Sequence, residues 1–233
     1  MIRIDCHTHT RTSWDSLIHY RRFVADAVNA GLDAVAITDH NSQEGLRRLR
    51  ELEPPFRLIP GVEVVTASGE IIGLFIEEMP PPYRSVDDTV RFIKERGGVV
   101  VLPHIFTPLA TERLQPPGLW RALELADAIE TVNARNHHPL SDEMARRLAV
   151  HYGKPMTAGS DAHLPGCLGN GHLRMEPFTD AADFLAKLPR AETILRRRSS
   201  FLENFGSVLR AVVERGTFGL PPRGALPRDR LGE

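Results

Sequence analysis

The first nine residues, MIRIDCHTH, carry Asp5, His7 and His9 at every second position. In an extended strand, side chains two residues apart point to the same face of the strand. This spacing predicts that one carboxylate and two imidazoles meet at one point, while Cys6 points away and packs as a core thiol. Crowding these polar side chains together removes their hydration and costs free energy. A bound metal cation offsets this cost. The stretch therefore predicts a metal site, with a polar surface strand as the alternative interpretation.

The same kinds of side chain recur close to the ends of later apolar segments. These further candidates are Asp15, Asp39, His40, Glu63, His104, Asp161 and His163. With His7 and His9, they place five of the ten histidines at expected strand ends. Mixed imidazole and carboxylate ligands suit Zn²⁺, Mn²⁺ or Fe²⁺ better than Mg²⁺. The set exceeds what one catalytic ion binds and suffices for two or three divalent ions.

The elements that must position these residues alternate between short apolar strands and helices. After the first strand, strands are expected at Asp33–Thr38, Arg57–Thr66, Ile71–Ile76, Val99–Leu102, Ala128–Val132, Met156–Ala158 and His172–Phe178. Helices are expected at Leu17–Ala30, from a cap at Asn41 or Ser42 to Glu51, at Ser85–Arg96, around Leu119, and at Leu140–Tyr152, Asp180–Leu188 and Ser200–Arg215. This alternation is typical of a mainly parallel α/β barrel with polar groups at the carboxyl ends of its strands. We expect one domain over residues 1–219 and a loose tail over residues 220–233.

Composition narrows the functional classes. The net charge of −1 gives no electrostatic reason to expect nucleic-acid or membrane binding. The two cysteines, Cys6 and Cys167, make no disulfide framework and fit a reducing cytoplasm, where we expect the protein to be located. There is no apparent signal peptide, and no apolar run approaches the ~18 residues of a spanning helix. Neither a GxGxxG motif after the first strand nor a phosphate-binding GxxxxGK[ST] motif is present.

Five short motifs contain most of the candidate residues. In chain order they are DCHTHT (Asp5–Thr10), ITDH (Ile37–His40), PGVE (Pro60–Glu63), LPH (Leu102–His104) and GSDAH (Gly159–His163). As an ordered set, they resemble the PHP family, named for polymerase and histidinol phosphatase domains. The resemblance implies a distorted, TIM-like (β/α)7 barrel with a di- or trinuclear metal centre that hydrolyses phosphate esters.

The resemblance also implies roles for individual residues. One metal would be held by His7, His9, Glu63 and Asp161; Glu63 would bridge to a second metal at His104; Asp15, His40 and His163 would hold a third. Asp5 and Asp39 would orient imidazoles. Some relatives have histidine at the Asp15 position, and many have a further histidine ligand between Glu63 and His104. In this region the present chain offers Glu70. Either Glu70 replaces that histidine with an oxygen ligand, which we expect, or the second metal has fewer protein ligands.

The expected chemistry is attack on phosphorus by a metal-bound hydroxide held by Glu63 and Asp161, while the cations screen the phosphoryl charge. Arg135 is the candidate clamp for the phosphate, because a guanidinium matches two phosphate oxygens. Arg11 and Arg84 are alternatives to it, and Asn133 is either a substrate contact or a turn residue. The expected substrate is a small phosphorylated metabolite or nucleotide.

Three other functions remain open. A 5′–3′ exonuclease or phosphodiesterase could use the same metals, but it would need a basic or aromatic track, and only 6% of the residues are aromatic. The second alternative function is that of a metal-stabilised structural module without enzymatic activity. An amidohydrolase also opens with HxH on a barrel strand, but none of Lys94, Lys154 and Lys187 lies at a strand end suited to a bridging carboxylated lysine. The sequence indicates no oligomeric state.

Overall fold

The computed structural model describes residues 1–107, 113–200, 203, 206 and 209. Its strands are β1 (Ile2–Asp5), β2 (Ala34–Ile37), β3 (Arg57–Thr66), β4 (Gly69–Leu74), β5 (Val99–Leu102), β6 (Ala128–Asn133), β7 (Met156–Gly159), β8 (Gly171–Met175) and β9 (Glu192–Leu195). Its helices are α1 (Tyr20–Ala30), α2 (Glu44–Arg50), α3 (Val86–Glu95), α4 (Gly118–Leu125), α5 (Pro139–His151), α6 (Ala181–Lys187) and the 3₁₀ turn η1 (Leu188–Arg190). The helix expected over Ser200–Arg215 lies largely outside the described residues, and the expected tail lies wholly outside them.

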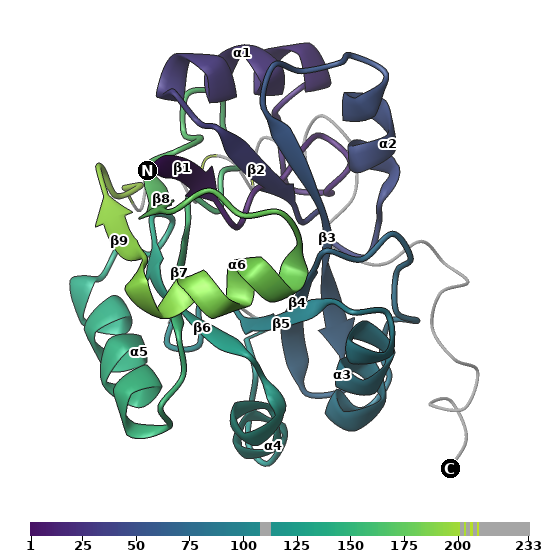
Figure 1. Cartoon of the computed structure of the whole chain (residues 1–233), viewed down its shortest axis with the longest axis vertical. Helices are drawn as coiled ribbons and strands as arrows, with labels where there is room; N and C mark the ends of the chain where they lie inside the picture. The colour runs from purple at the N-terminus through teal and green to yellow at the C-terminus, as the bar shows by residue number, and fades with distance from the viewer. Residues whose placement is uncertain (108–112, 201–202, 204–205, 207–208, 210–233) are drawn as a thin grey trace.

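Within the described residues, the nine strands form one sheet in the order β7-β6-β5-β4-β3-β2-β1-β8-β9. Strands β1, β2 and β3 pair in parallel, as do β5, β6 and β7, whereas β4, β8 and β9 are antiparallel to their neighbours. The Cys6 amide donates to the Ala158 carbonyl at 3.2 Å, and the Asp161 amide donates to the His7 carbonyl at 2.8 Å. These two hydrogen bonds connect the segment after β1 with β7 and the segment after β7, so that the strands from β1 to β7 nearly form a ring. The expected α/β barrel is confirmed as a nearly closed barrel (Figure 1).

The interior of the barrel changes from apolar to polar along the strands. On β3, Ile59 and Glu63 point to the same face, because they are four positions apart in an extended strand. On β6, the same spacing rule places Ala128 and Glu130 on one face. One buried cluster includes Ile59 and Ala128 and also Phe184 of α6, which crosses the sheet in Figure 1. The apolar end of the barrel is thus filled by α6, and the acidic residues lie further along the strands.

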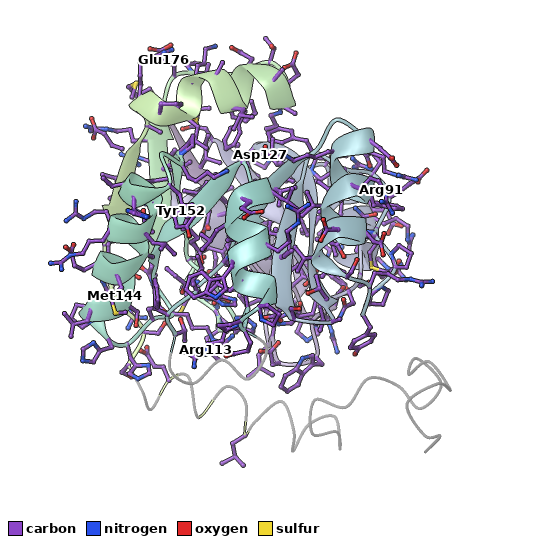
Figure 2. The ribbon with its side chains drawn as sticks, turned by 90° about the horizontal axis from the view of Figure 1, so that it is seen from below. Arg91, Arg113, Asp127, Met144, Tyr152 and Glu176 are labelled. Atoms are coloured by element: carbon purple, nitrogen blue, oxygen red, sulfur yellow. The ribbon has the colours of Figure 1, made fainter. Side chains whose placement is uncertain are left out.

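The outer faces of the strands pack against the other helices. Val100 and Ile129 belong to a buried cluster with residues of α3, α4 and α5, and Val35 belongs to another with residues of α1 and α2. Figure 2 shows α3, α4 and α5 along one side of the molecule, with Arg91 and Met144 on their outer surface. No helix in the described part of the chain combines the length and apolar character that crossing a membrane requires.

Most element boundaries lie where local signals predict them. Gly31 ends α1 in the left-handed conformation at φ 68°, and the Ser85 hydroxyl caps α3 by accepting the Asp88 amide at 3.1 Å. Of the two expected caps, Ser42 accepts the amide of Glu44, the first residue of α2, at 3.2 Å, although Gln43 is the residue directly before the helix. The Asn41 side chain instead accepts the Val65 amide at 2.9 Å and so ties the end of β2 to β3.

Candidate metal centre

The expected metal-binding residues lie together at one end of the barrel. His7 and His9 follow β1, Asp15 lies in the next loop, His40 follows β2, Glu63 and Glu70 lie in β3 and β4, His104 follows β5, and Asp161 and His163 follow β7. All are buried except His40, which is nearly so. Four overlapping sets have donor atoms within 4.8 Å of one another: His9–His40–His163, His7–His9–Glu63, His7–His104–Asp161 and His40–Glu63–Glu70.

His7 and His9 point their Nε2 atoms at each other and at two carboxylates. The two Nε2 atoms are 3.0 Å apart, and each is 3.3 Å from Glu63 Oε2. Asp161 Oδ1 lies 3.7 Å from His7 Nε2 and 3.4 Å from His9 Nε2. Four donor groups therefore surround one point, which is the arrangement that the resemblance implied for the first metal.

The hydrogen bonds on the far side of each ring fix where its lone pair lies. His7 Nδ1 faces Glu130 Oε1 at 3.0 Å, and an ionised carboxylate can only accept, so Nδ1 carries the proton. Ser13 Oγ donates to Asp39 at 2.7 Å and so accepts from His9 Nδ1 at 2.9 Å. When the two rings are neutral, as metal binding requires, the Nε2 lone pair of each is consequently directed at the other ring and at the carboxylates.

Glu63 connects this group to a second one. Its Oε1 lies 2.9 Å from His104 Nε2, while its Oε2 lies 3.2 Å from His40 Nδ1. Glu70 reaches the same two histidines, at 3.3 Å from His40 Nδ1 and 3.6 Å from His104 Nε2. Glu70 on β4 therefore stands where an oxygen donor could complete a second metal position.

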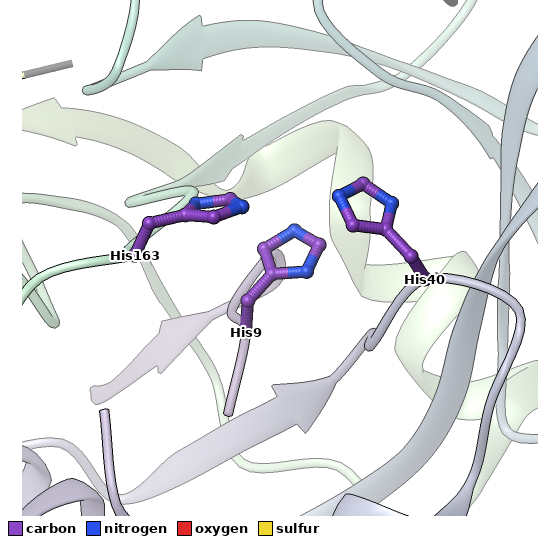
Figure 3. Close-up of side chains that lie close together, drawn as sticks. All are labelled: His9, His40 and His163. Atoms are coloured by element: carbon purple, nitrogen blue, oxygen red, sulfur yellow. The ribbon is translucent and has the colours of Figure 1, made fainter. Parts of the chain in front are cut away.

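A third group lies on the other side of His9. His163 Nε2 is 2.9 Å from Asp15 Oδ2, and His40 Nε2 is 3.5 Å from Asp15 Oδ1. The ring centroid of His9 lies 4.2 Å from that of His163 and 4.5 Å from that of His40, and Figure 3 shows His9 between the other two rings. His163 Nδ1 donates to the Asp161 carbonyl at 2.8 Å, which again leaves Nε2 directed at a carboxylate.

The charges in the cluster are strongly coupled. Burial would lower the pKa of His7, but the carboxylates of Glu63, Asp161 and Glu130 raise it well above its usual range. Burial would raise the pKa of Glu63, yet His7 and His40 hold it well below its usual range. The pKa of Asp161 is lowered in the same way by His7 and by Arg135. The carboxylates therefore stay ionised and attract positive charge to the centre of the site.

This donor set fits divalent cations. Lone pairs of buried imidazoles face ionised carboxylates, and only a proton or a metal ion between them makes that contact favourable. Among the described residues, Asp15 Oδ1, His40 Nδ1 and His104 Nδ1 are buried polar atoms without a hydrogen-bond partner. His104 and Asp161 also adopt positive φ angles of 27° and 49°, a strained conformation of the kind that concentrates at functional sites.

The two carboxylates expected to orient imidazoles act differently. The oxygens of Asp5 accept backbone amides, from Ser160 and Gly169 at 2.9 Å each and from His7 at 3.3 Å. Asp5 is in none of the donor groups of the centre, so the expectation that its carboxylate converges there with His7 and His9 is wrong. Asp39 acts on His9 through Ser13 and also accepts the Thr10 amide at 2.7 Å.

Cys6 is buried in the barrel core, as expected.

Arg135 and Asn133, the expected substrate contacts, have different surroundings. Arg135 lies at the edge of the third group, with its guanidinium 3.1 Å from His163 Nε2, 3.3 Å from Asp15 and 3.7 Å from Asp161. The Asn133 amide nitrogen donates to Glu130 at 2.8 Å and to Asp161 at 3.1 Å. Its oxygen accepts the amides of Arg135 and Asn136. The NH₂ group and the oxygen of the Asn133 side chain thus each have two partners within the protein. This favours a role in the turn over a contact with the substrate.

Sequence reasoning missed Glu130. This buried residue contacts His7 directly and also accepts the His104 amide at 2.9 Å. The available signal was a single carboxylate within the otherwise uncharged strand AIETVN. A buried, charged residue in such a strand requires a partner.

Two family models match separate parts of the chain. A model of the PHP domain matches residues 5–96, and a model described as PHP-associated matches residues 139–193. The uncharacterized protein MJ1587 of Methanocaldococcus jannaschii is 37% identical over 120 residues, covering 46% of this chain and 70% of that protein. An error-prone DNA polymerase of Nocardia farcinica is 28% identical over 232 residues, covering 93% of this chain and 19% of the polymerase.

A solved structure shows the same fold at low sequence identity. It is a two-domain protein from Bacteroides vulgatus that contains a predicted PHP-like metal-dependent phosphoesterase. The TM-score is 0.68 at 20% identity, and the match covers 83% of this chain and 64% of that chain. The present chain therefore spans slightly less than two thirds of that protein.

Proposed function

This chain belongs to the PHP domain family, and from that premise we propose that it is a metal-dependent phosphoesterase. Its proposed substrate is a phosphomonoester of a small metabolite or nucleotide. The proposal is supported mainly by the arrangement of His7 and His9. Their Nε2 atoms lie 3.0 Å apart and face the carboxylates of Glu63 and Asp161. Buried donors in this arrangement are suited to Zn²⁺, Mn²⁺ or Fe²⁺.

The proposed ligand sets follow the three groups of donors. His7, His9, Glu63 and Asp161 form the first; Glu63, Glu70, His104 and His40 form the second; Asp15, His40 and His163, beside His9, form the third. When bound, divalent cations supply an activated water molecule and screen the charge of the phosphoryl oxygens. The protein contributes by holding the imidazole lone pairs and the carboxylates at fixed positions.

Arg135 is the proposed contact for the phosphate group. Its side chain is 22% exposed, whereas those of Asp15 and His163 beside it are almost fully buried, so it can meet a substrate that enters from solvent. Guanidinium groups bind two phosphate oxygens at once and stabilise negative charge that develops in the transition state.

Release of inorganic phosphate tests the proposal. The full chain, loaded with Mn²⁺, is incubated with sugar phosphates and nucleoside monophosphates, in parallel with Glu63→Gln and with Glu78→Gln as a matched control. Glu78 is exposed, pairs with Arg96 and belongs to none of the three proposed ligand sets. We expect turnover by the parent and the control and a loss of turnover in Glu63→Gln. Equal rates in all three proteins would refute the assignment of the site.

A phosphodiesterase acting on nucleic acid is the second candidate. It is favoured by one observation, the similarity along 93% of this chain to an error-prone DNA polymerase. Cleavage of bis-p-nitrophenyl phosphate or of short oligonucleotides, without release of phosphate from monoesters, would replace the first proposal with this one.

A further inference from the structure

Glu130 is a buried carboxylate in β6 that belongs to none of the three proposed ligand sets. Its side chain is 2% exposed, and it lies on the interior face of the barrel, next to the metal centre. A charge buried to this extent is costly unless its oxygens are well bonded. The partners of its two oxygens therefore indicate what the residue does.

Each oxygen of Glu130 is bonded to a different part of the centre. Oε1 accepts His7 Nδ1 at 3.0 Å, and Oε2 accepts the backbone amide of His104 at 2.9 Å. Oε2 also accepts the side-chain amide of Asn133 at 2.8 Å, and the same nitrogen donates to Asp161 Oδ2 at 3.1 Å. One carboxylate thus contacts His7 and His104 and, through Asn133, connects to Asp161.

We propose that Glu130 is the positioning residue that couples the first two metal positions, by fixing the His7 ring and the His104 backbone together. The inference rests on the proposed function only in that the site binds divalent metal. Glu130 keeps the Nδ1 proton of His7 in place, so that Nε2 presents a lone pair to the metal. It also holds the segment at His104, where φ is 27°, by bonding its amide.

The substitution Glu130→Gln tests this role because no orientation of a glutamine amide satisfies all three donors. If its oxygen faces His7, its NH₂ group faces the donors of His104 and Asn133. If its NH₂ group faces His7, it opposes the Nδ1 proton and favours the tautomer that protonates Nε2. Either orientation leaves buried donors facing each other, with almost no change in side-chain volume.

The first measurement is the dissociation constant for Zn²⁺, obtained by competition with a fluorescent chelator. We expect Glu130→Gln to bind Zn²⁺ about 10–100-fold more weakly than the parent, the usual effect of removing a group that orients a ligand. The control Glu78→Gln should bind as the parent does, because that carboxylate is 69% exposed and paired with Arg96. Unchanged affinity in Glu130→Gln would overturn the proposal.

The second measurement is the imidazole N–H signal of His7 in ¹⁵N-histidine-labelled, Zn²⁺-loaded protein, assigned with His7→Gln. In the parent we expect a hydrogen-bonded Nδ1 proton that exchanges slowly with solvent, and in Glu130→Gln a shifted or fast-exchanging one. An identical signal in both proteins would contradict the proposal.

If Glu130→Gln does not fold, Glu130→Asp replaces it. We expect this variant to bind Zn²⁺ more weakly than the parent, because the shorter side chain cannot reach both partners. A protein that meets both expectations but releases no phosphate would leave this inference standing and the proposed function wrong.

Discussion

At the scale of single residues, hydrogen bonds outside the centre decide what the centre can bind. Glu130 and Ser13 hold the Nδ1 protons of His7 and His9, so both Nε2 lone pairs point inward. Glu63 then supplies one oxygen to each of two neighbouring groups of donors. The chemistry of the site thus depends as much on these outer contacts as on the ligands themselves.

Arg135→Met separates phosphate binding from metal binding. Removing the guanidinium should lower kcat/KM for a phosphomonoester by about 10²-fold, a loss typical of one charged donor to the transition state. Affinity for Mn²⁺ should not weaken, because a positive charge beside Asp15 and Asp161 has been removed. Steady-state kinetics and a metal titration on the same preparation provide the check. Unaltered kinetics would exclude Arg135 as the phosphate contact.

At the scale of elements, the site depends on strand ends and on the loops that follow them. The loop after β6 is held by Asp142 of α5, which accepts from Asn136 at 2.8 Å and from Arg198 at 2.6 Å. This loop carries Arg135 and directly follows Asn133, the last residue of β6. The barrel thus positions most of the proposed metal-binding residues in or directly after strands, and its candidate phosphate contact in a loop braced by a helix.

Asp142→Asn tests that brace through the pH dependence of stability. Burial raises the pKa of Asp142 above its usual value, although Asn136 and Arg198 act against the shift. The folded state therefore binds this proton more tightly than the unfolded state does. The stability gained is fully present below the unfolded pKa of about 3.9 and is lost as the pH rises through the folded pKa. Measured by urea unfolding, the variant should gain stability relative to the parent between pH 4 and pH 7. Parallel stability curves would count against a raised pKa.

Much of the fold and of the candidate site was predictable from local pattern. Short apolar segments ending in histidine or acidic residues predicted the barrel and which side chains meet. The strand directions were not predictable, because β4 is as apolar as the neighbouring strands β3 and β5 although it runs antiparallel to both. The backbone partners of Asp5 were not predictable because Ser160 and Gly169 lie more than 150 residues away in the sequence. Glu130 was missed because its strand has no motif beside it.

At the scale of the whole molecule, the barrel separates an apolar end from a polar one. Phe184 of α6 packs against Phe75 and Phe178 within the apolar cluster. The other end gathers five imidazoles and at least as many carboxylates in little space. Such a concentration of buried ionisable groups opposes folding unless bound cations neutralise the carboxylates.

Removing the metal should therefore lower thermal stability. A ligand that binds only the folded state at 100 times its dissociation constant adds about 2.7 kcal/mol, which for a chain of this size corresponds to roughly 5–10 °C in Tm. Thermal unfolding followed by circular dichroism, with Mn²⁺ and then with excess chelator, measures the difference. Glu63→Gln should show a much smaller response to Mn²⁺. An identical Tm with and without metal in the parent would contradict the expectation.

The central claim is that separate strand ends bring nitrogen and oxygen donors together to bind divalent cations. Anomalous diffraction from a crystal of the full chain grown with Mn²⁺ tests it most directly. The account predicts two or three anomalous peaks, one of them within about 2.0–2.4 Å of donor atoms from His7, His9, Glu63 and Asp161. A well-ordered site in Mn²⁺-saturated crystals without an anomalous peak among these side chains would contradict it.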